Sequence, residues 1–307
     1  MKKVRFVRVD VFTDRPFRGN ALAVFPDARG LTTKEMQLLA NEMNLSETTF
    51  VLPPSKGSGA DAKVRIFVPD MEIPYAGHPT VGTFYVLAKE GRIKLKGPVT
   101  HAKMESGAGV LPVEIHSSGG KIQKVVTVQK QPVFGRVFDD PRDIAEAVSI
   151  SPSDLDTGRM PVQSIDTGIP WVIMPVRSRK AIEHASGNSN AFAKAMRDLP
   201  KETGFYITCL DPVKSGSTTH SRGFSLISGN VVEDPATGSA SGCLGSYLVR
   251  HGLVDVRRVT RIVNEQGYEI GRPSKIDIEI HTSATGGIEA VRVGGSVVEM
   301  MEGVAYV

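Results

Sequence analysis

The architecture expected for this chain is set by residues 229–252, which read G-N-V-V-E-D-P-A-T-G-S-A-S-G-C-L-G-S-Y-L-V-R-H-G. The β-branched pair near the start is typical of a strand, and the sequence then turns acidic at Glu233 and Asp234. Asp234 is a favoured helix N-cap residue. Pro235 comes next, and proline is favoured at the first helical position because its missing N–H would be unpaired there anyway. The stretch therefore predicts a strand, an acidic turn and a helix.

The predicted helix begins with very small side chains. Leu244, Tyr247 and Leu248 fall at helical spacing, and Gly252 is placed to end the helix. Residues 236–242, which precede them, are all Gly, Ala, Ser or Thr. Such a start lets a helix pack closely inside a protein, or it leaves backbone N–H groups open to an anion, which the helix dipole favours. This stretch alone allows both interpretations.

The first half of the chain carries a second copy of the pattern. Residues 73–82 read I-P-Y-A-G-H-P-T-V-G, and they open a helix that is expected to end at Gly91. Shorter echoes precede the two copies, and these are E-T-T-F-V-L-P (47–53) with E-T-G-F-Y-I-T (202–208), and K-V-R-I-F-V-P (63–69) with S-R-G-F-S-L-I (221–227). The 31 residues from Glu47 to His78 nearly equal the 32 from Glu202 to Asp234. Repeated elements in one order predict an internal repeat.

The elements around these motifs indicate the α+β class. A helix is expected from Thr32, because Thr32 and Glu35 form a capping-box pair. Alternating residues at 4–12 and 20–25 predict strands. We expect two pseudo-symmetric domains, each a curved and mostly antiparallel sheet wrapped around one central helix. The two helix N-termini are expected to face an interdomain cleft that holds the active site, since ligand sites tend to lie in such clefts.

Composition excludes several classes of protein. A chain of 307 residues is long enough for two domains. The net charge of +4 comes with no run of Lys and Arg, so nucleic acid is not an expected partner. No stretch approaches about 18 apolar residues, so no membrane association is expected. The 7 scattered His and 2 Cys form no metal or redox motif, so we expect a cytoplasmic protein without metal or disulfide.

Four motifs together resemble the PhzF-like family, which is named for a phenazine-biosynthesis isomerase and has the diaminopimelate epimerase-like fold. The motifs are D-V-F-T-D-R-P-F-R-G-N-A-L-A-V (10–24), N-L-S-E-T-T-F-V (44–51), A-G-H-P-T-V-G (76–82) and E-D-P-A-T-G-S-A-S-G (233–242). In that fold the last strand typically returns to the first domain. The resemblance therefore implies a first domain of 1–128 with 295–307 and a second of 129–294. It also implies a homodimer in a biosynthetic process.

The resemblance further implies a reaction and the residues that carry it. In the phenazine isomerase a glutamate moves a proton between carbons of trans-2,3-dihydro-3-hydroxyanthranilate without a metal or cofactor. The matching glutamate here is Glu47, and His78 and Asp234 match residues that hold and polarise the substrate. The residues that match the binding site for its carboxylate are Gly77, Gly238 and Ser239. The implied partner is a small carboxylate-bearing metabolite.

Elementary chemistry agrees with this assignment. A carbon-bound proton is weakly acidic, so its transfer needs a positioned base and stabilisation of the developing negative charge. A carboxylate such as Glu47 can serve as the base. Two helix N-termini aimed at one cavity supply the stabilisation without a metal.

Two other functions stay open. One is an amino-acid epimerase or racemase. Diaminopimelate epimerases and proline racemases use a cysteine at each helix start, whereas Cys209 lies in a predicted strand and Cys243 well inside a helix. The other is a non-catalytic protein that binds a small ligand in the cleft. Glu47 has a counterpart in Glu202, so the E-T-x-F start can have a structural use. The presence of all three implied catalytic residues favours the isomerase.

Overall fold

The computed structural model describes residues 1–227 and 229–307. These residues form two compact units, of which the first contains 1–128 and 294–307 and the second contains 129–293. Gly294, which the sequence-based division assigns to the second domain, lies in the first unit. Among the described residues, no helix is both long enough and apolar enough to cross a membrane.

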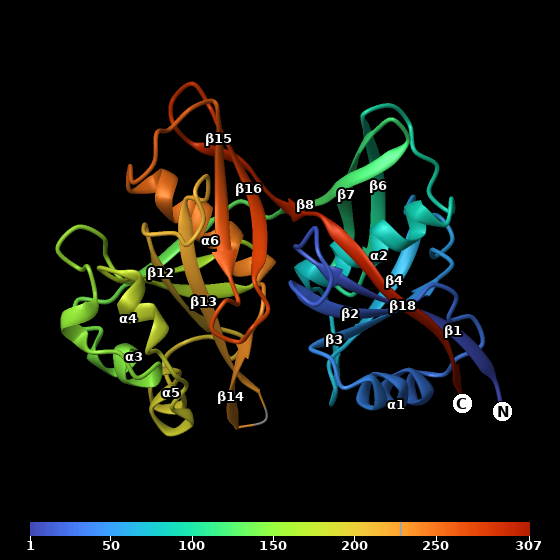
Figure 1. Cartoon of the computed structure of the whole chain (residues 1–307), viewed down its shortest axis with the longest axis horizontal. Helices are drawn as coiled ribbons and strands as arrows, with labels where there is room; N and C mark the ends of the chain where they lie inside the picture. Colours follow the sequence, from blue (N-terminus) through green and yellow to red (C-terminus); the bar gives the residue numbers. More distant parts are fainter. Residues whose placement is uncertain (228) are drawn as a thin grey trace. The chain divides into compact units, whose positions relative to one another are not determined.

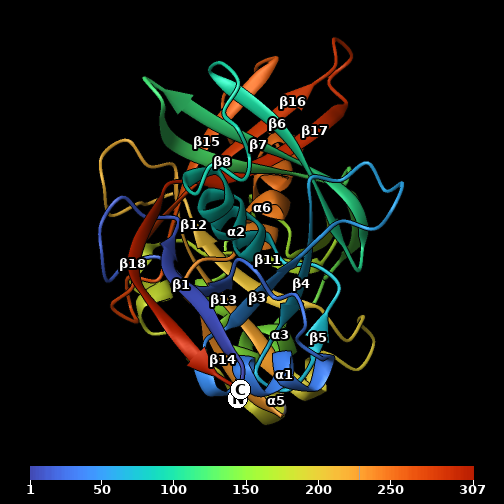
Figure 2. The same cartoon turned by 90° about the vertical axis from the view of Figure 1, so that its right-hand side faces the viewer.

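The first unit combines a series of paired strands with two helices. The helices are α1 (Thr33–Met43) and α2 (Gly77–Lys89). The strands are β1 (Lys3–Val11), β2 (Asn20–Phe25), β3 (Glu47–Leu52), β4 (Ala62–Phe67), β5 (Glu72–Ile73), β6 (Val99–Ser106), β7 (Gly109–Ser118), β8 (Lys121–Gln129) and β18 (Val297–Tyr306). The last strand, β18, runs antiparallel beside β1, so the two ends of the chain share one sheet (Figure 2).

The second unit has a similar series of strands and more helices. Its helices are α3 (Arg142–Ala147), the 3₁₀ helix η1 (Pro152–Asp154), α4 (Arg179–Glu183), α5 (Ser189–Ala195) and α6 (Gly238–Arg250). Its strands are β9 (Val133–Val137), β10 (Gln163–Asp166), β11 (Pro170–Pro175), β12 (Gly204–Cys209), β13 (Thr219–Ile227), β14 (Asn230–Asp234), β15 (Val259–Gln266), β16 (Ser274–Thr282) and β17 (Ile288–Gly295).

The two units share one strand topology. In the first unit β1–β2 is antiparallel, β2–β3 parallel and β3–β4 antiparallel, and β10 to β13 follow the same sequence of directions. Strand β4 then pairs antiparallel with β5 and parallel with β6, as β13 does with β14 and β15. The flanking strands β18 and β9 pair antiparallel with β1 and β10. The predicted α+β class and the internal repeat are therefore confirmed.

One central helix packs against the sheet of each unit. Helix α2 contacts β1, β2 and β7, and α6 contacts β11 and β16. Figure 1 shows the two helices, one in each unit. Glycine permits these close approaches. A Cβ at Gly82 would lie 2.6 Å from Leu22 Cδ2, and one at Gly245 would lie 2.6 Å from Ile278 Cγ2. Because interiors are close-packed, neither position has room for a methyl group. Gly82 and Gly245 therefore serve packing.

The other face of the first sheet is covered by α1. Thr32 and Glu35 form the predicted capping box, in which the Thr32 side chain accepts from the Glu35 N–H and the Glu35 side chain accepts from the Thr32 N–H. Beneath this helix, Phe50 stacks on Phe25 with ring centroids 4.8 Å apart and meets the ring of Phe67 edge-on at 5.4 Å. Each fully buried side chain of this kind contributes about 1.5–3 kcal/mol relative to an exposed one.

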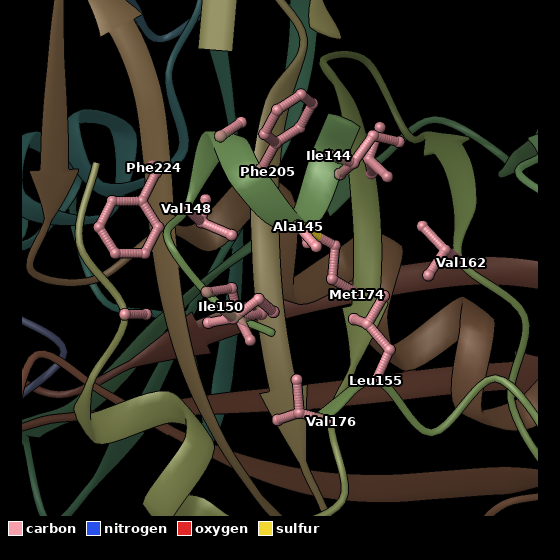
Figure 3. Close-up of a cluster of buried hydrophobic side chains, with 14 of the residues drawn as sticks. Ile144, Ala145, Val148, Ile150, Leu155, Val162, Met174, Val176, Phe205 and Phe224 are labelled. Carbon is pink, nitrogen blue, oxygen red and sulfur yellow. The ribbon is translucent and has the colours of Figure 1, made fainter. Parts of the chain in front are cut away.

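The second unit has its main apolar core between strands β11 to β13 and the short helices α3 to α5. Apolar side chains from α3, from the segment after it and from the strands point toward one another in this core (Figure 3). Phe192 of α5 stacks on Phe205 of β12 with ring centroids 4.3 Å apart. Such aromatic pairs add about 0.5–1.5 kcal/mol beyond the burial of their area.

The start of α6 differs from the prediction. The helix begins at Gly238 with Thr237 as its N-cap residue, so Asp234 is not the N-cap and Pro235 is not the first helical residue. Strand β14 continues to Asp234, which is paired with Gly223 of β13. Because the ladder holds Asp234 in extended conformation, the helix can begin only after the Asp-Pro turn.

This start also changes the register of the repeat. The first residues of the two central helices are Gly77 and Gly238, so the structural equivalent of His78 is Ser239 and not Asp234. Glu47 is 30 residues before Gly77, whereas Glu202 is 36 residues before Gly238. The near-equal spacing read from the sequence therefore paired the wrong residues. Of the six extra residues, four lie in the longer β13–β14 hairpin and two lie between Glu202 and the start of β12.

We expect the Gly242→Ala variant to be less stable by about 1–3 kcal/mol, the usual cost of overpacking. Its Cβ would lie 1.8 Å from Gln129 Oε1, and Gln129 Nε2 donates to the Gly238 carbonyl in the first turn of α6. The higher helix propensity of alanine offsets at most about 1 kcal/mol. Urea unfolding followed by the fluorescence of Trp171, the single tryptophan, measures the change.

The matched control is Gly158→Ala. A Cβ at Gly158 meets nothing within 4 Å, so this variant should stay within about 0.5 kcal/mol of the parent protein. Equal stability of the Gly242 and Gly158 variants would contradict the packing role assigned to Gly242.

Candidate active site

The first group of candidate residues lies in the first unit, where Glu47 and His78 meet. Glu47 is the first residue of β3 and pairs in register with Leu22 of β2. His78 is the second residue of α2 and is 4% exposed. The Nε2 atom of His78 lies 3.4 Å from Glu47 Oε2, and the Glu47 side chain is 16% exposed. The structure thus brings together two of the predicted catalytic residues, and Gly77 precedes one of them.

Asn20 is a further residue of this group, and the sequence analysis did not identify it. It is the first residue of β2 and is 1% exposed. Its Nδ2 atom lies 3.2 Å from His78 Nδ1. The available signal was its place directly after the turn motif T-D-R-P-F-R-G, because asparagine is uncommon in strands. A contact between residues 58 positions apart cannot be derived from that signal.

His78 is neutral at pH 7. Burial lowers the pKa of His78 to about 3, because the desolvated imidazolium has lost its hydration. The Asn20 contact acts in the same direction, since a proton on Nδ1 would point at an amide N–H that can only donate. His78 can therefore offer or accept a hydrogen bond here without carrying charge.

The second group lies in the second unit, at the end of β14 and the start of α6. The Thr237 hydroxyl donates to Asp234 Oδ2 at 2.7 Å. Gln266 holds the same turn, because its Nε2 donates to the Asp234 carbonyl and to Thr237 Oγ1, and its Oε1 accepts from the Thr237 N–H. Asp234 is thus an acceptor held in place by a buried amide rather than a helix cap.

Ser239 and Gly238 form the first turn of α6. The Ser239 Oγ accepts a hydrogen bond of 3.0 Å from Trp171 Nε1. Because the indole N–H can only donate, this bond leaves the Ser239 hydroxyl proton available for another acceptor.

The two central helices begin alike. The N-cap residues are Ala76 for α2 and Thr237 for α6, and neither makes a side-chain cap bond to its own helix. Alanine has no polar side chain, and the threonine hydroxyl donates to Asp234 instead. The first N–H groups of both helices are therefore not covered by a cap side chain, which is the arrangement that favours an anion.

The predicted site residues thus fall into two groups, with Glu47, Gly77 and His78 in the first unit and Asp234, Gly238 and Ser239 in the second. That the two groups face one interdomain cleft stays a prediction. Among the described residues, no three His, Cys, Asp or Glu side chains are grouped so as to hold a metal ion.

Glu202 differs from Glu47 in its surroundings. It lies exposed in the turn before β12, whose first residue is Gly204. Glu47, by contrast, is inside the strand ladder and beside a buried imidazole. Of the two E-T-x-F glutamates, only Glu47 has surroundings that suit proton transfer.

Both cysteines are buried away from the helix starts. Cys209 ends β12, and Cys243 is the sixth residue of α6, where its Sγ contacts the Ile165 carbonyl. Burial raises the pKa of Cys209 to about 11 and that of Cys243 to about 12. Since the thiolate is the reactive form, neither thiol is poised to act as a base or nucleophile.

We therefore expect both thiols to resist alkylation at pH 8 in the folded protein. With a pKa of about 11, as for Cys209, roughly one thiol in a thousand is ionised at that pH, against about one in four for a free cysteine. Iodoacetamide labelling followed by mass spectrometry should show labelling at least about 100-fold slower than in urea. Labelling of either cysteine at the unfolded rate would show that the site is accessible and ionised after all.

Comparison with known proteins relates the whole chain to one family. The family model described as phenazine biosynthesis-like protein (PhzC-PhzF) matches residues 9–303. The trans-2,3-dihydro-3-hydroxyanthranilate isomerase of Pseudomonas aeruginosa is 33% identical over 305 residues, 98% of this chain and 99% of the relative. The uncharacterized isomerase YfhB of Bacillus subtilis is 32% identical over 298 residues, 97% of each chain. The crystal structure of the Bacillus anthracis PhzF-family phenazine biosynthesis protein matches with a TM-score of 0.90 at 29% identity, over 100% of both chains.

The matched range includes every residue of the two candidate groups, and the folds agree along the full length. The resemblance seen in the four sequence motifs is thereby confirmed. This chain belongs to the PhzF-like family of phenazine biosynthesis-like proteins.

Proposed function

We propose that this protein is an isomerase that moves a proton between carbon atoms of a small carboxylate-bearing metabolite, with Glu47 as the proton carrier. The observation that carries the proposal is the placement of Glu47, whose carboxylate lies 3.4 Å from the buried, neutral His78 at the start of α2. Family membership supports it, since the matched relatives carry isomerase names.

The proposed reaction has two balanced steps. The Glu47 carboxylate takes a proton from a substrate carbon, so a C–H bond breaks and an O–H bond forms. The electron pair stays on the substrate and spreads into its conjugated system. In the second step Glu47 returns a proton to another carbon, so the O–H bond breaks and a new C–H bond forms. The product then has the same net charge as the substrate, and Glu47 is a carboxylate again. A single carboxylate suffices when the proton leaves the first carbon and reaches the second on the same face of the substrate.

The intermediate of this reaction is more negative than the substrate, so it needs hydrogen-bond donors that are already in place. Gly77 and Gly238 begin helices whose N-cap side chains make no cap bond, and Ser239 has a hydroxyl proton to donate. We assign the substrate carboxylate to these three residues. Asp234 accepts from Thr237 and can also accept from a substrate hydroxyl or amine.

The substrate that we propose for a first trial is trans-2,3-dihydro-3-hydroxyanthranilate, which the Pseudomonas aeruginosa relative is named for. It bears the carboxylate that the helix starts suit. The homodimer expected from the family resemblance also stays a prediction.

The burial of both cysteines speaks against the racemase alternative. A two-thiol mechanism needs two ionisable thiols at the helix starts, and burial raises the pKa of Cys209 and Cys243 instead. The alternative of a non-catalytic binding protein differs from the isomerase in one measurable respect, which is proton exchange at substrate carbon.

We expect Glu47→Gln to abolish isomerisation while ligand binding is kept, because glutamine has the shape of glutamate but cannot accept the proton. General acid–base groups contribute about 10² to 10⁴ in rate, and a sole proton carrier should reach the upper end. The measurement is deuterium incorporation from heavy water into trans-2,3-dihydro-3-hydroxyanthranilate, with binding followed by calorimetry.

Glu202→Gln is the matched control, because it makes the same change at the exposed counterpart in the repeat. It should leave the rate unchanged. A Glu47→Gln rate within about tenfold of the parent enzyme would rule Glu47 out as the proton carrier. Binding without any exchange in the parent protein would favour the non-catalytic alternative.

A further inference from the structure

The contact between Asn20 and His78 carries an inference that rests on the proposed function and extends it. We infer that Asn20 is a positioning residue that fixes His78 as the tautomer with its proton on Nε2. In this state His78 carries its hydrogen on the ring nitrogen that is nearer Glu47 and offers this carboxylate no basic nitrogen. Glu47 is then the only proton acceptor of the pair.

The tautomer follows from the chemistry of the two groups. A neutral imidazole has one N–H donor and one acceptor nitrogen, whereas the nitrogen of a carboxamide only donates. Since Asn20 Nδ2 lies 3.2 Å from His78 Nδ1, Nδ1 is the acceptor. The proton must therefore be on Nε2, the atom 3.4 Å from Glu47 Oε2. This distance is longer than a typical hydrogen bond, and such contacts often tighten when substrate binds.

The backbone holds Asn20 in place from both sides. Gly19 before it has a φ of +66°, and a Cβ there would lie 2.1 Å from the Val11 carbonyl, so only glycine fits this turn. Asn20 itself pairs with Val11 of β1. Two residues further along β2, Leu22 pairs with Glu47. Neighbouring positions of one strand thus set the two groups that face the imidazole, and rigid elements position side chains more accurately than loops do.

The fixed tautomer has a consequence for the path of the proton. After Glu47 has taken a proton from the substrate, an unprotonated Nε2 would accept a hydrogen bond from the protonated carboxyl group and hold its hydrogen away from the substrate carbon. An Nε2–H cannot accept it, so the proton stays on Glu47 until it returns to carbon. Asn20 therefore keeps the acidic hydrogen of protonated Glu47 free to return to the substrate. It also keeps an uncharged donor beside the Glu47 carboxylate before the reaction.

The direct test is the protonation state of the His78 ring. Long-range ¹H–¹⁵N spectra of the protein labelled with ¹⁵N-histidine distinguish protonated from unprotonated ring nitrogens, and loss of signals in His78→Gln assigns them. We expect an unprotonated Nδ1 and a protonated Nε2 at pH 7. A protonated Nδ1 with a bare Nε2 would overturn the inference, since the Asn20 amide would then be turned to accept.

The informative variant is Asn20→Asp, which replaces the donor by an acceptor of the same shape. The aspartate should move the proton to Nδ1, stabilise the imidazolium and raise the pKa of His78. We expect kcat to fall by about 10² to 10⁴, as it does when other catalytic histidines are held in the wrong tautomer, with KM changed less than tenfold. The pH–rate profile should gain a new ionisation from His78.

Asn20→Ala serves as the second variant and guards against misfolding of the aspartate variant. It removes the donor without adding an acceptor, so the spectra should show a mixture of tautomers and a smaller loss of kcat. Loss of activity in either folded variant while His78 keeps its Nε2 proton would show a merely structural role for Asn20. Parent-level kcat with a changed tautomer would show that the tautomer does not matter.

These outcomes are separable from failure of the proposed function. If Glu47→Gln stays active, Glu47 is not the proton carrier, whatever the spectra show. If Glu47→Gln is dead and His78 of the parent protein has its proton on Nδ1, the function stands and the role of Asn20 is wrong.

Discussion

The close packing of each central helix on its sheet is the constraint on which the candidate site depends. At Gly82 and Gly245 a methyl group would lie 2.6 Å from a side chain of the sheet. At these two positions each helix therefore lies so close to its sheet that there is no room for a Cβ. A helix held this closely cannot shift along or around its axis without a clash, because interiors are close-packed. Its first turn is fixed as a result. His78 and Ser239, the second residues of the two helices, are presented at defined places for that reason.

Much of the fold could be predicted from the sequence, because its signals are local. The capping box of Thr32 and Glu35 and the glycine after the second central helix, Gly252, are read from neighbouring residues, and the structure contains both. The repeat was visible because the same elements recur in the same order. Its residue-by-residue register was not visible, since β13 and β14 form a longer hairpin than β4 and β5. Counting residues across that hairpin paired His78 with Asp234 rather than with Ser239.

The candidate residues could be named from the sequence, but the contacts that surround them could not. Asn20 lies in the 10–24 motif, which indicates no chemical role for it, and Gln266 lies in none of the four motifs. Each acts across 29 residues or more of chain. Two similar sequence segments, which begin at Glu47 and Glu202, also have different environments. Glu47 is paired in β3, whereas Glu202 lies two residues before the start of β12 and faces solvent. Strand pairing decides burial here, and burial distinguishes Glu47, which we propose as the proton carrier, from the solvent-exposed Glu202.

His78 and Ser239, the equivalent residues at the two helix starts, share a hydrogen-bond arrangement although they differ in residue type. His78 accepts from the Asn20 amide at Nδ1, and Ser239 accepts from the Trp171 indole at Oγ. In each unit, a side chain from a neighbouring strand donates a hydrogen bond to the helix residue. The polar hydrogen of the helix residue is then available to be donated to another group. Because an indole N–H can only donate, Ser239 Oγ must be the acceptor in its bond with Trp171. The two copies of the repeat have thus diverged in residue type, one titratable and one not, while each presents a neutral donor beside uncapped helix N–H groups. That pattern suits a ligand which becomes more negative as it reacts.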